Sequence, residues 1–204
     1  MSLNNIEEIA NYIVSDGKGI LAADESNPTC GKRFDSIGVE STEENRRDYR
    51  EMLFRSKGIK GNIGGVILFD ETIRQSSDDG TLLRDIISNQ GALPGIKVDK
   101  GLQPIDGCPG ETVTVGLEGL NERLNEYSSM GAKFTKWRAV INIGDGIPTD
   151  KCIDANMEAL ADYAKCAQDN GMVPIVEPEV LLDGDHSIDE CYAASVRSLK
   201  SLFD

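Results

Sequence analysis

Short apolar runs recur five times along this chain, and amphipathic stretches lie between them. Charged residues follow four of the runs, and the remaining run carries two cations within it. The runs span residues 19–23, 66–69, 96–98, 134–141 and 172–176. Short apolar runs that alternate with helical patterns predict parallel strands joined by helices, which is an α/β fold.

The intervening stretches place apolar residues at helical spacing. The first carries Ile6, Ile9 and Ile13 on one face, and Asp16-Gly17 is a typical C-terminal stop. The second opens with Ser41-Thr42-Glu43-Glu44, which resembles a capping box. Further helices are predicted around residues 82–87, 117–127, 153–164 and 188–203.

Two architectures use repeated βα units: an open doubly wound sheet and a TIM (β/α)8 barrel. The open sheet usually carries a Gly-rich phosphate turn after its first strand. Here Gly17-Lys18-Gly19 precedes the first run, and Gly31-Lys32-Arg33 lacks the spacing of a nucleotide loop. We therefore predict a TIM barrel, forming one domain over residues 1–204. Because a complete barrel usually needs about 250 residues, we expect an incomplete one with about five βα units.

Acidic residues outnumber basic ones, with 35 Asp and Glu against 21 Lys and Arg and a formal net charge of -14. This excess disfavours nucleic acid and acidic membrane surfaces as partners, because both need clustered cations. No stretch approaches the roughly 20 apolar residues of a membrane span, and the N-terminus lacks a signal-peptide pattern. We therefore expect a cytoplasmic protein without a membrane or nucleic-acid partner.

Zinc and disulfide chemistry are not expected either. Catalytic zinc sites usually draw on two or three histidines, and this chain has one, His186. The five cysteines are widely spaced and include no Cys-x-x-Cys pair, which is typical of reduced thiols in a cytosol. We therefore predict no metal and no cofactor.

Charged side chains gather on the later predicted strands. Side chains two positions apart point the same way, so Lys136 and Arg138 share one face, as do Glu177 and Glu179. One interpretation is a structural ion-pair network. The other is a site that binds an anionic substrate and moves protons, since lysines and carboxylates at a barrel mouth can be tuned for acid–base work. Trp137 should face the opposite way, into the core.

Two further strand ends extend this cluster. Asp24 follows the first run and Lys100 follows the third, so parallel strands would bring both to one end of the sheet. Asp70 and Glu71 hold the same position after the second run but have no cationic neighbour in sequence. We therefore include Asp24 and Lys100 among the candidate site residues.

Several blocks resemble class I fructose-1,6-bisphosphate aldolases, in that family's order and over nearly the whole chain. The resemblance implies a TIM-barrel lyase of glycolysis and gluconeogenesis that needs no metal. Such an enzyme reversibly cleaves fructose 1,6-bisphosphate into dihydroxyacetone phosphate and glyceraldehyde 3-phosphate. The matching blocks are residues 19–26, 42–47, 64–69, 95–101, 136–138 and 173–179.

The resemblance also implies a role for each of four catalytic residues. Asp24 would transfer protons and position the substrate, and Glu177 would be the general acid–base. Glu179 would assist imine formation, and Lys136 would stabilise charge at the reacting centre.

Four substrate-binding residues are implied in the same way. Ser26 and Arg33 lie in the loop after the first strand, where the family grips a substrate phosphate. Lys100 would bind substrate hydroxyls or phosphate, and Arg138 would support the phosphate site.

The family's Schiff-base lysine lies on the sixth strand, and we expect this chain to end before that strand. An imine is the electron sink that makes C–C cleavage possible at neutral pH. We therefore expect a truncated chain that is inactive alone. Because the family is commonly tetrameric, the full-length form is expected to be a homo-oligomer.

Three alternatives stay open. The chain could be a catalytically dead module that binds sugar phosphates or proteins through the remaining half-site. It could also be an α/β structural domain with an internal ion-pair network. In a third alternative Lys136 forms the imine itself, since transaldolases resemble this barrel and place that lysine on the fourth strand.

Overall fold

A computed structural model of the chain describes residues 5–204, which fold into two compact units. The first unit comprises the chain up to Lys97 together with Asn125–Thr135 and Gly171–Val173. The second comprises Val98–Leu124, Lys136–Asn170 and Pro174–Asp204. The prediction of one domain over residues 1–204 stays a prediction, and residues 1–4 lie outside the described residues.

All five apolar runs form strands, and these strands make one sheet in the order β1-β2-β3-β6-β7. β2 pairs in parallel with both β1 and β3. Each strand therefore lies beside the next large strand along the chain, as expected for βα units wound in one direction. The bounds are β1 Gly19–Ala23, β2 Ile63–Leu68, β3 Leu93–Lys97, β6 Phe134–Ile141 and β7 Val173–Val180.

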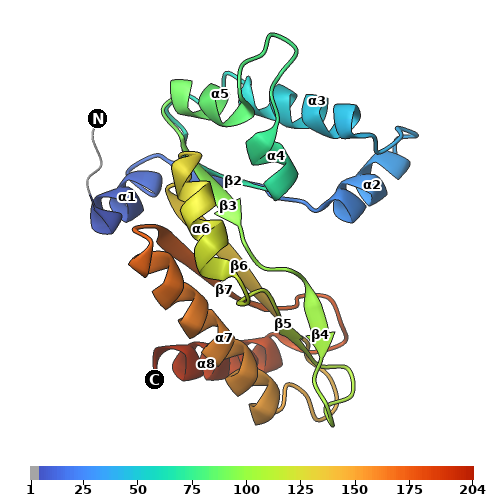
Figure 1. The fold of residues 1–204 in the computed structure, drawn as a ribbon. Helices are drawn as coiled ribbons and strands as arrows, with labels where there is room; N and C mark the ends of the chain where they lie inside the picture. The colour runs from blue at the N-terminus through green and yellow to red at the C-terminus, as the bar shows by residue number, and fades with distance from the viewer. Residues whose placement is uncertain (1–4) are drawn as a thin grey trace. The chain divides into compact units, whose positions relative to one another are not determined.

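Two helices of the first unit, α1 and α3, begin after residues whose side chains cap them. Asn5 precedes α1, and its side chain accepts a hydrogen bond from the Glu8 backbone N–H at 2.8 Å. α3 begins after Thr42, which accepts from the Asn45 N–H at 3.1 Å, so the N-cap lies one residue after the predicted Ser41. Figure 1 shows α3 and α4 grouped around α5. The helices are α1 Ile6–Ile13, α3 Glu43–Phe54, α4 Asp70–Arg74 and α5 Leu83–Asn89.

A further helix, α2 (Asn27–Asp35), occupies the stretch that we predicted as a loop after the first strand. The loop prediction for Arg33 is therefore wrong, and Ser26 is the N-cap residue of this helix. Pro28 stands in the first turn, where its fixed backbone angle favours a helix. Cys30 and Phe34, one turn apart, are buried and provide the apolar face.

The second unit contains two long helices and a short hairpin. α7 (Asp150–Asp169) and α8 (Ile188–Phe203) lie side by side, as Figure 1 shows. α6 (Leu120–Ser129) begins in this unit and ends in the other. The hairpin pairs β4 (Leu102–Pro104) with β5 (Thr112–Thr114) and was not predicted, because its strands are short and carry no apolar run.

α8 confirms a predicted helix, but its buried residues are not its large apolar ones. Its buried residues are Ala194 and Ser198, whereas large apolar side chains along it are exposed. The exposed ones are Ile188, Tyr192, Leu199 and Phe203.

Two side chains of β6, Phe134 and Trp137, show how the core of each unit is packed. In the second unit Trp137 is fully buried and stacks on Tyr163 of α7, with ring centroids 5.4 Å apart, which confirms its predicted core position. In the first unit Phe134 is fully buried against the backbone of the neighbouring strands. A methyl group at Gly95 would lie 2.3 Å from the Phe134 ring, so a side chain has no space there.

We therefore expect Gly95→Ala to destabilise the chain by roughly 1–3 kcal/mol, because overpacking a rigid core displaces its side chains. Gly19→Ala is the matched control, since it adds the same methyl group to a strand with nothing within 4 Å. Urea unfolding followed by far-UV circular dichroism measures both changes. Equal unfolding free energies for the two variants would contradict the expectation.

Candidate functional site

The eight predicted site residues divide between the two units. Asp24, Ser26 and Arg33 belong to the first unit. The other five, which are Lys100, Lys136, Arg138, Glu177 and Glu179, belong to the second.

In the second unit, two ion pairs join β6 to β7. The Lys136 Nζ atom lies 3.1 Å from Glu177 Oε2, and the Arg138 guanidinium pairs with the Glu179 carboxylate. The predicted spacing of two residues on each strand thus places both cations opposite both carboxylates. The Lys136 side chain is only 12% exposed, so Glu177 compensates a cation that is largely withdrawn from water.

Lys100 stands at the base of the β4–β5 hairpin in the same unit. Its backbone N–H donates to the Val115 carbonyl at 2.7 Å, and the residue itself is exposed. It lines a hollow of about 610 Å³ together with residues 113–118, Gln103 and Ala159. The cation therefore stands beside a space large enough for a small ligand.

In the first unit, two acidic residues, Asp24 and Glu25, follow the end of β1. Asp24 is buried, and Glu25 pairs with Arg50 of α3, with the Arg50 Nη1 atom 2.6 Å from Glu25 Oε2. Arg33 of α2 pairs with the same Glu25 carboxylate. The Ser26 hydroxyl lies 3.0 Å from the Thr29 hydroxyl. Glu25 thus ties both α2 and α3 to the end of the strand that presents Asp24.

A second ion pair joins α3 to the start of α4. The Arg46 guanidinium donates to both oxygens of Glu71, at 2.8 and 2.6 Å, and Asn27 donates to one of them at 3.2 Å. These hydrogen bonds, above all those from Arg46, lower the pKa of the Glu71 carboxyl below its ordinary value. Glu71 therefore does have a cationic partner, which lies 25 residues away in the sequence.

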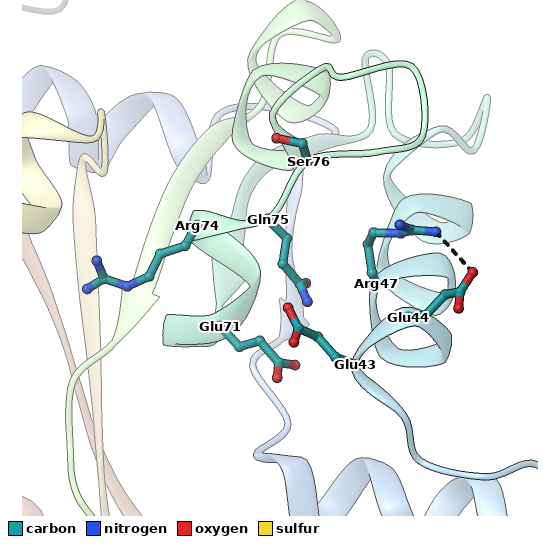
Figure 2. Close-up of a pocket in the computed structure, with 7 residues that line it drawn as sticks. All are labelled: Glu43, Glu44, Arg47, Glu71, Arg74, Gln75 and Ser76. Atoms are coloured by element: carbon teal, nitrogen blue, oxygen red, sulfur yellow. Dashed lines mark ion pairs between the residues drawn. The ribbon is translucent and has the colours of Figure 1, made fainter.

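A hollow of about 780 Å³ lies beside this ion pair. Figure 2 shows the side chains that line it. Arg47 points towards Glu44 at its rim, 3.9 Å away, while Arg74 turns aside to pair with Asp70 and Glu126. Both signs of charge line the hollow, and none of the eight predicted residues does. Its lining residues are Glu43, Glu44, Arg47, Glu71, Arg74, Gln75 and Ser76.

The pairs formed by Glu25 and Glu71 were missed by sequence reasoning. Both glutamates lie within three residues of a strand end, which is the region that selected Asp24. Their partners Arg50 and Arg46 lie within α3, among other charged residues. The sequence alone does not distinguish an arginine that pairs with a distant carboxylate from one that is solvated.

Within residues 5–204, no three His, Cys, Asp or Glu side chains gather so that they could hold a metal ion. No helix in the same range combines the length and apolarity needed to cross a membrane. The five cysteines carry free thiols, and burial raises the pKa of the Cys152 thiol to about 12.

The Glu71 pair predicts a pH-dependent contribution to stability. A carboxyl whose pKa is lowered by folding stabilises the folded state above its unfolded pKa of 4.5, and this contribution is lost as the pH falls through the folded pKa. We expect Glu71→Gln to cost about 1–3 kcal/mol at neutral pH, and the cost to shrink below pH 4.5.

Urea unfolding at a series of pH values measures this cost, with the exposed Glu40→Gln as control. A cost for Glu71→Gln that stays constant from neutral to strongly acidic pH would refute the linkage.

Comparisons with known proteins identify the family of this chain. The family model "Fructose-bisphosphate aldolase class-I" matches residues 5–204. A relative named "Probable fructose-bisphosphate aldolase class 1", from Xanthomonas campestris, is 54% identical over 203 residues, covering 100% of this chain and 61% of the relative. "Fructose-bisphosphate aldolase 4, cytosolic" from Arabidopsis thaliana is 50% identical, covering 98% of this chain and 52% of its own length.

A solved structure agrees. The fructose-bisphosphate aldolase from Plasmodium falciparum, in complex with TRAP and a small molecule inhibitor, matches with a TM-score of 0.94 and 44% identity. The match covers 100% of this chain and 62% of that one, and it confirms the predicted α/β fold of an incomplete TIM barrel. The chain spans between about half and three fifths of the length of these relatives, and it belongs to the class I fructose-bisphosphate aldolase family.

Proposed function

We propose that this chain forms part of a class I fructose-1,6-bisphosphate aldolase, which reversibly cleaves its substrate into dihydroxyacetone phosphate and glyceraldehyde 3-phosphate through a Schiff base and without a metal. The observation that carries the proposal is the double ion pair between β6 and β7, Lys136 with Glu177 and Arg138 with Glu179. Two cations and two carboxylates on adjacent strands can both bind an anionic substrate and transfer protons.

Each member of this cluster has a distinct role in the proposal. Glu177 is the general acid–base, because it is about one third exposed and can reach a substrate while Lys136 holds it in place. Lys136 stabilises negative charge that develops at the reacting centre. Glu179 assists imine formation, and Arg138 beside it supports the phosphate site.

The remaining predicted residues serve substrate binding and positioning. Lys100 binds substrate hydroxyls or phosphate from its place beside the hollow of the second unit. In the first unit, Ser26 and Arg33 at the two ends of α2 bind a phosphate, and the buried Asp24 transfers protons and positions the substrate. The proximity of Asp24 to the other site residues, at the carboxyl ends of the strands, remains a prediction.

The imine-forming lysine is assigned to the part of the relatives that this chain does not match, so the chain by itself is inactive in this proposal. A cytoplasmic location is supported by the Arabidopsis relatives, whose names include "cytosolic". A homotetrameric full-length form is carried over from the family resemblance alone.

A single kinetic comparison tests the role of Glu177. The test uses the chain followed by the segment of the Xanthomonas campestris relative beyond its match, here named the extended protein. We expect it to cleave fructose 1,6-bisphosphate in a coupled assay equally well with and without EDTA. Glu177→Gln should lower kcat by roughly a hundredfold or more, since it removes the acid–base group.

The control is Glu158→Gln, which changes an exposed glutamate of α7 and should leave kcat unchanged. An inactive extended protein that still binds fructose 1,6-bisphosphate by calorimetry would favour the catalytically dead module instead. An unchanged kcat in Glu177→Gln would refute the assignment of the acid–base.

Borohydride trapping distinguishes the two lysine positions at which the imine could form. We expect dihydroxyacetone phosphate and borohydride to label the extended protein on a lysine beyond Asp204, because the Lys136 Nζ atom is already engaged by the Glu177 carboxylate at 3.1 Å. Peptide mass spectrometry locates the adduct, and Lys136→Met should still be labelled. An adduct on Lys136 would instead support the transaldolase-like alternative.

A further inference from the structure

Lys100 and Arg138 are both connected to β5, the second strand of the hairpin. The Lys100 N–H donates to the Val115 carbonyl at 2.7 Å, and the Val115 N–H donates to the Gly101 carbonyl at 3.0 Å. On the other side, the Thr114 hydroxyl donates to the Arg138 carbonyl at 2.8 Å. The position of this short strand therefore fixes the backbone of two cations assigned to substrate binding.

β5 is too short to hold its own position. It contains three residues, and a two-stranded hairpin is marginally stable by itself in water. The backbone groups of Glu111 and Val115 face the β4 side of the hairpin. The Ile105 N–H donates to the Glu111 carbonyl at 3.1 Å, and the Val115 N–H donates to the Gly101 carbonyl at 3.0 Å. Alternate residues of a strand bond to opposite sides, so Thr112 and Thr114 present their backbone groups at the other edge.

The side chain of Asn156, on α7, occupies this second edge. Its Nδ2 atom donates to the Thr112 carbonyl at 2.8 Å, and its Oδ1 atom accepts from the Thr114 N–H at 3.2 Å. One amide thus supplies the donor and the acceptor that a third strand would offer. Asn156 is fully buried, so no water can replace these two bonds without a rearrangement.

A second connection holds the far end of the hairpin. Glu111 is buried and accepts from the backbone N–H and the hydroxyl of Thr149, the N-cap of α7, both at 2.7 Å. Loss of Asn156 would therefore release the outer edge of β5, next to Lys100 and Arg138, while the hairpin stays attached to α7 through Glu111.

We propose that Asn156 is a positioning residue for the substrate-binding cations Lys100 and Arg138, and that it acts through β5. This inference rests on the proposed function for its consequence in catalysis. Asparagine is required because alanine removes the acceptor of the Thr114 N–H and leaves the Thr112 carbonyl with the long contact from the Cys152 thiol at 3.8 Å. Aspartate sets an oxygen against the Thr112 carbonyl.

Amide hydrogen exchange of the 204-residue chain tests the connection without any activity. Asn156→Ala should speed exchange at the Lys100 and Val115 N–H groups at least tenfold. Met157→Ala is the matched control, because Met157 is buried on the same helix but points about 100° away from Asn156. Equal acceleration at these two amides in both variants would overturn the inference. If Asn156→Ala does not fold, Asn156→Ser provides the same comparison, since its hydroxyl can keep one of the two bonds.

Steady-state kinetics of the extended protein test the effect of Asn156 on substrate binding. Asn156→Ala should raise KM for fructose 1,6-bisphosphate about tenfold with a smaller change in kcat, because the displaced cations bind substrate. Met157→Ala should lower only the amount of folded enzyme, which leaves KM unchanged. An unchanged KM in Asn156→Ala would overturn the positioning role. A wild-type extended protein without activity would defeat the proposed function, while hydrogen exchange would still decide the role of Asn156 in β5.

Discussion

The alternation of side chains along β6 is the constraint on which the second unit depends. Lys136 and Arg138 lie on one face of the strand and pair with the carboxylates of β7, while Trp137 lies on the other face and stacks on Tyr163. Charged groups can be held near a low-dielectric interior only when their partners are fixed. The buried aromatic pair fixes the strand, and the strand in turn fixes the cations.

This alternation was predictable because it is local. The two-residue period of a strand is enough to predict that both cations share one face and that Trp137 lies in the core. The strands were predictable for the same reason, since each is a compact apolar run. The local pattern does not show which distant residue will pair with a given charged side chain. Glu71 seemed isolated because Arg46 lies 25 residues before it, and only the folded chain brings Arg46 of α3 beside Glu71 of α4.

Elements without a strong apolar signal were missed or misjudged. α2 contains Pro28 and Gly31, which usually indicate a loop, yet Pro28 stands in the first turn where it favours a helix. The β4–β5 hairpin has two strands of three residues, below the length at which alternation can be recognised. On α8 the apolar residues define a helix correctly, but Ala194 and Ser198 are the buried ones, because small side chains permit close helix packing. Asn156 carried no signal either, since a single asparagine on a helix is usually solvated.

α7 emerges as the common support of the charged residues in the second unit. Its Tyr163 packs against Trp137 and holds β6, and its Asn156 bonds to both ends of β5. The two residues lie about two helical turns apart, so one rigid rod sets the spacing between the strand that carries Lys136 and the strand that holds Lys100. A site built from several loops would need each loop to be ordered separately. Here one helix, buried along one face, orders the cations together, and its buried Asn156 is therefore as much a part of this geometry as the charged side chains themselves.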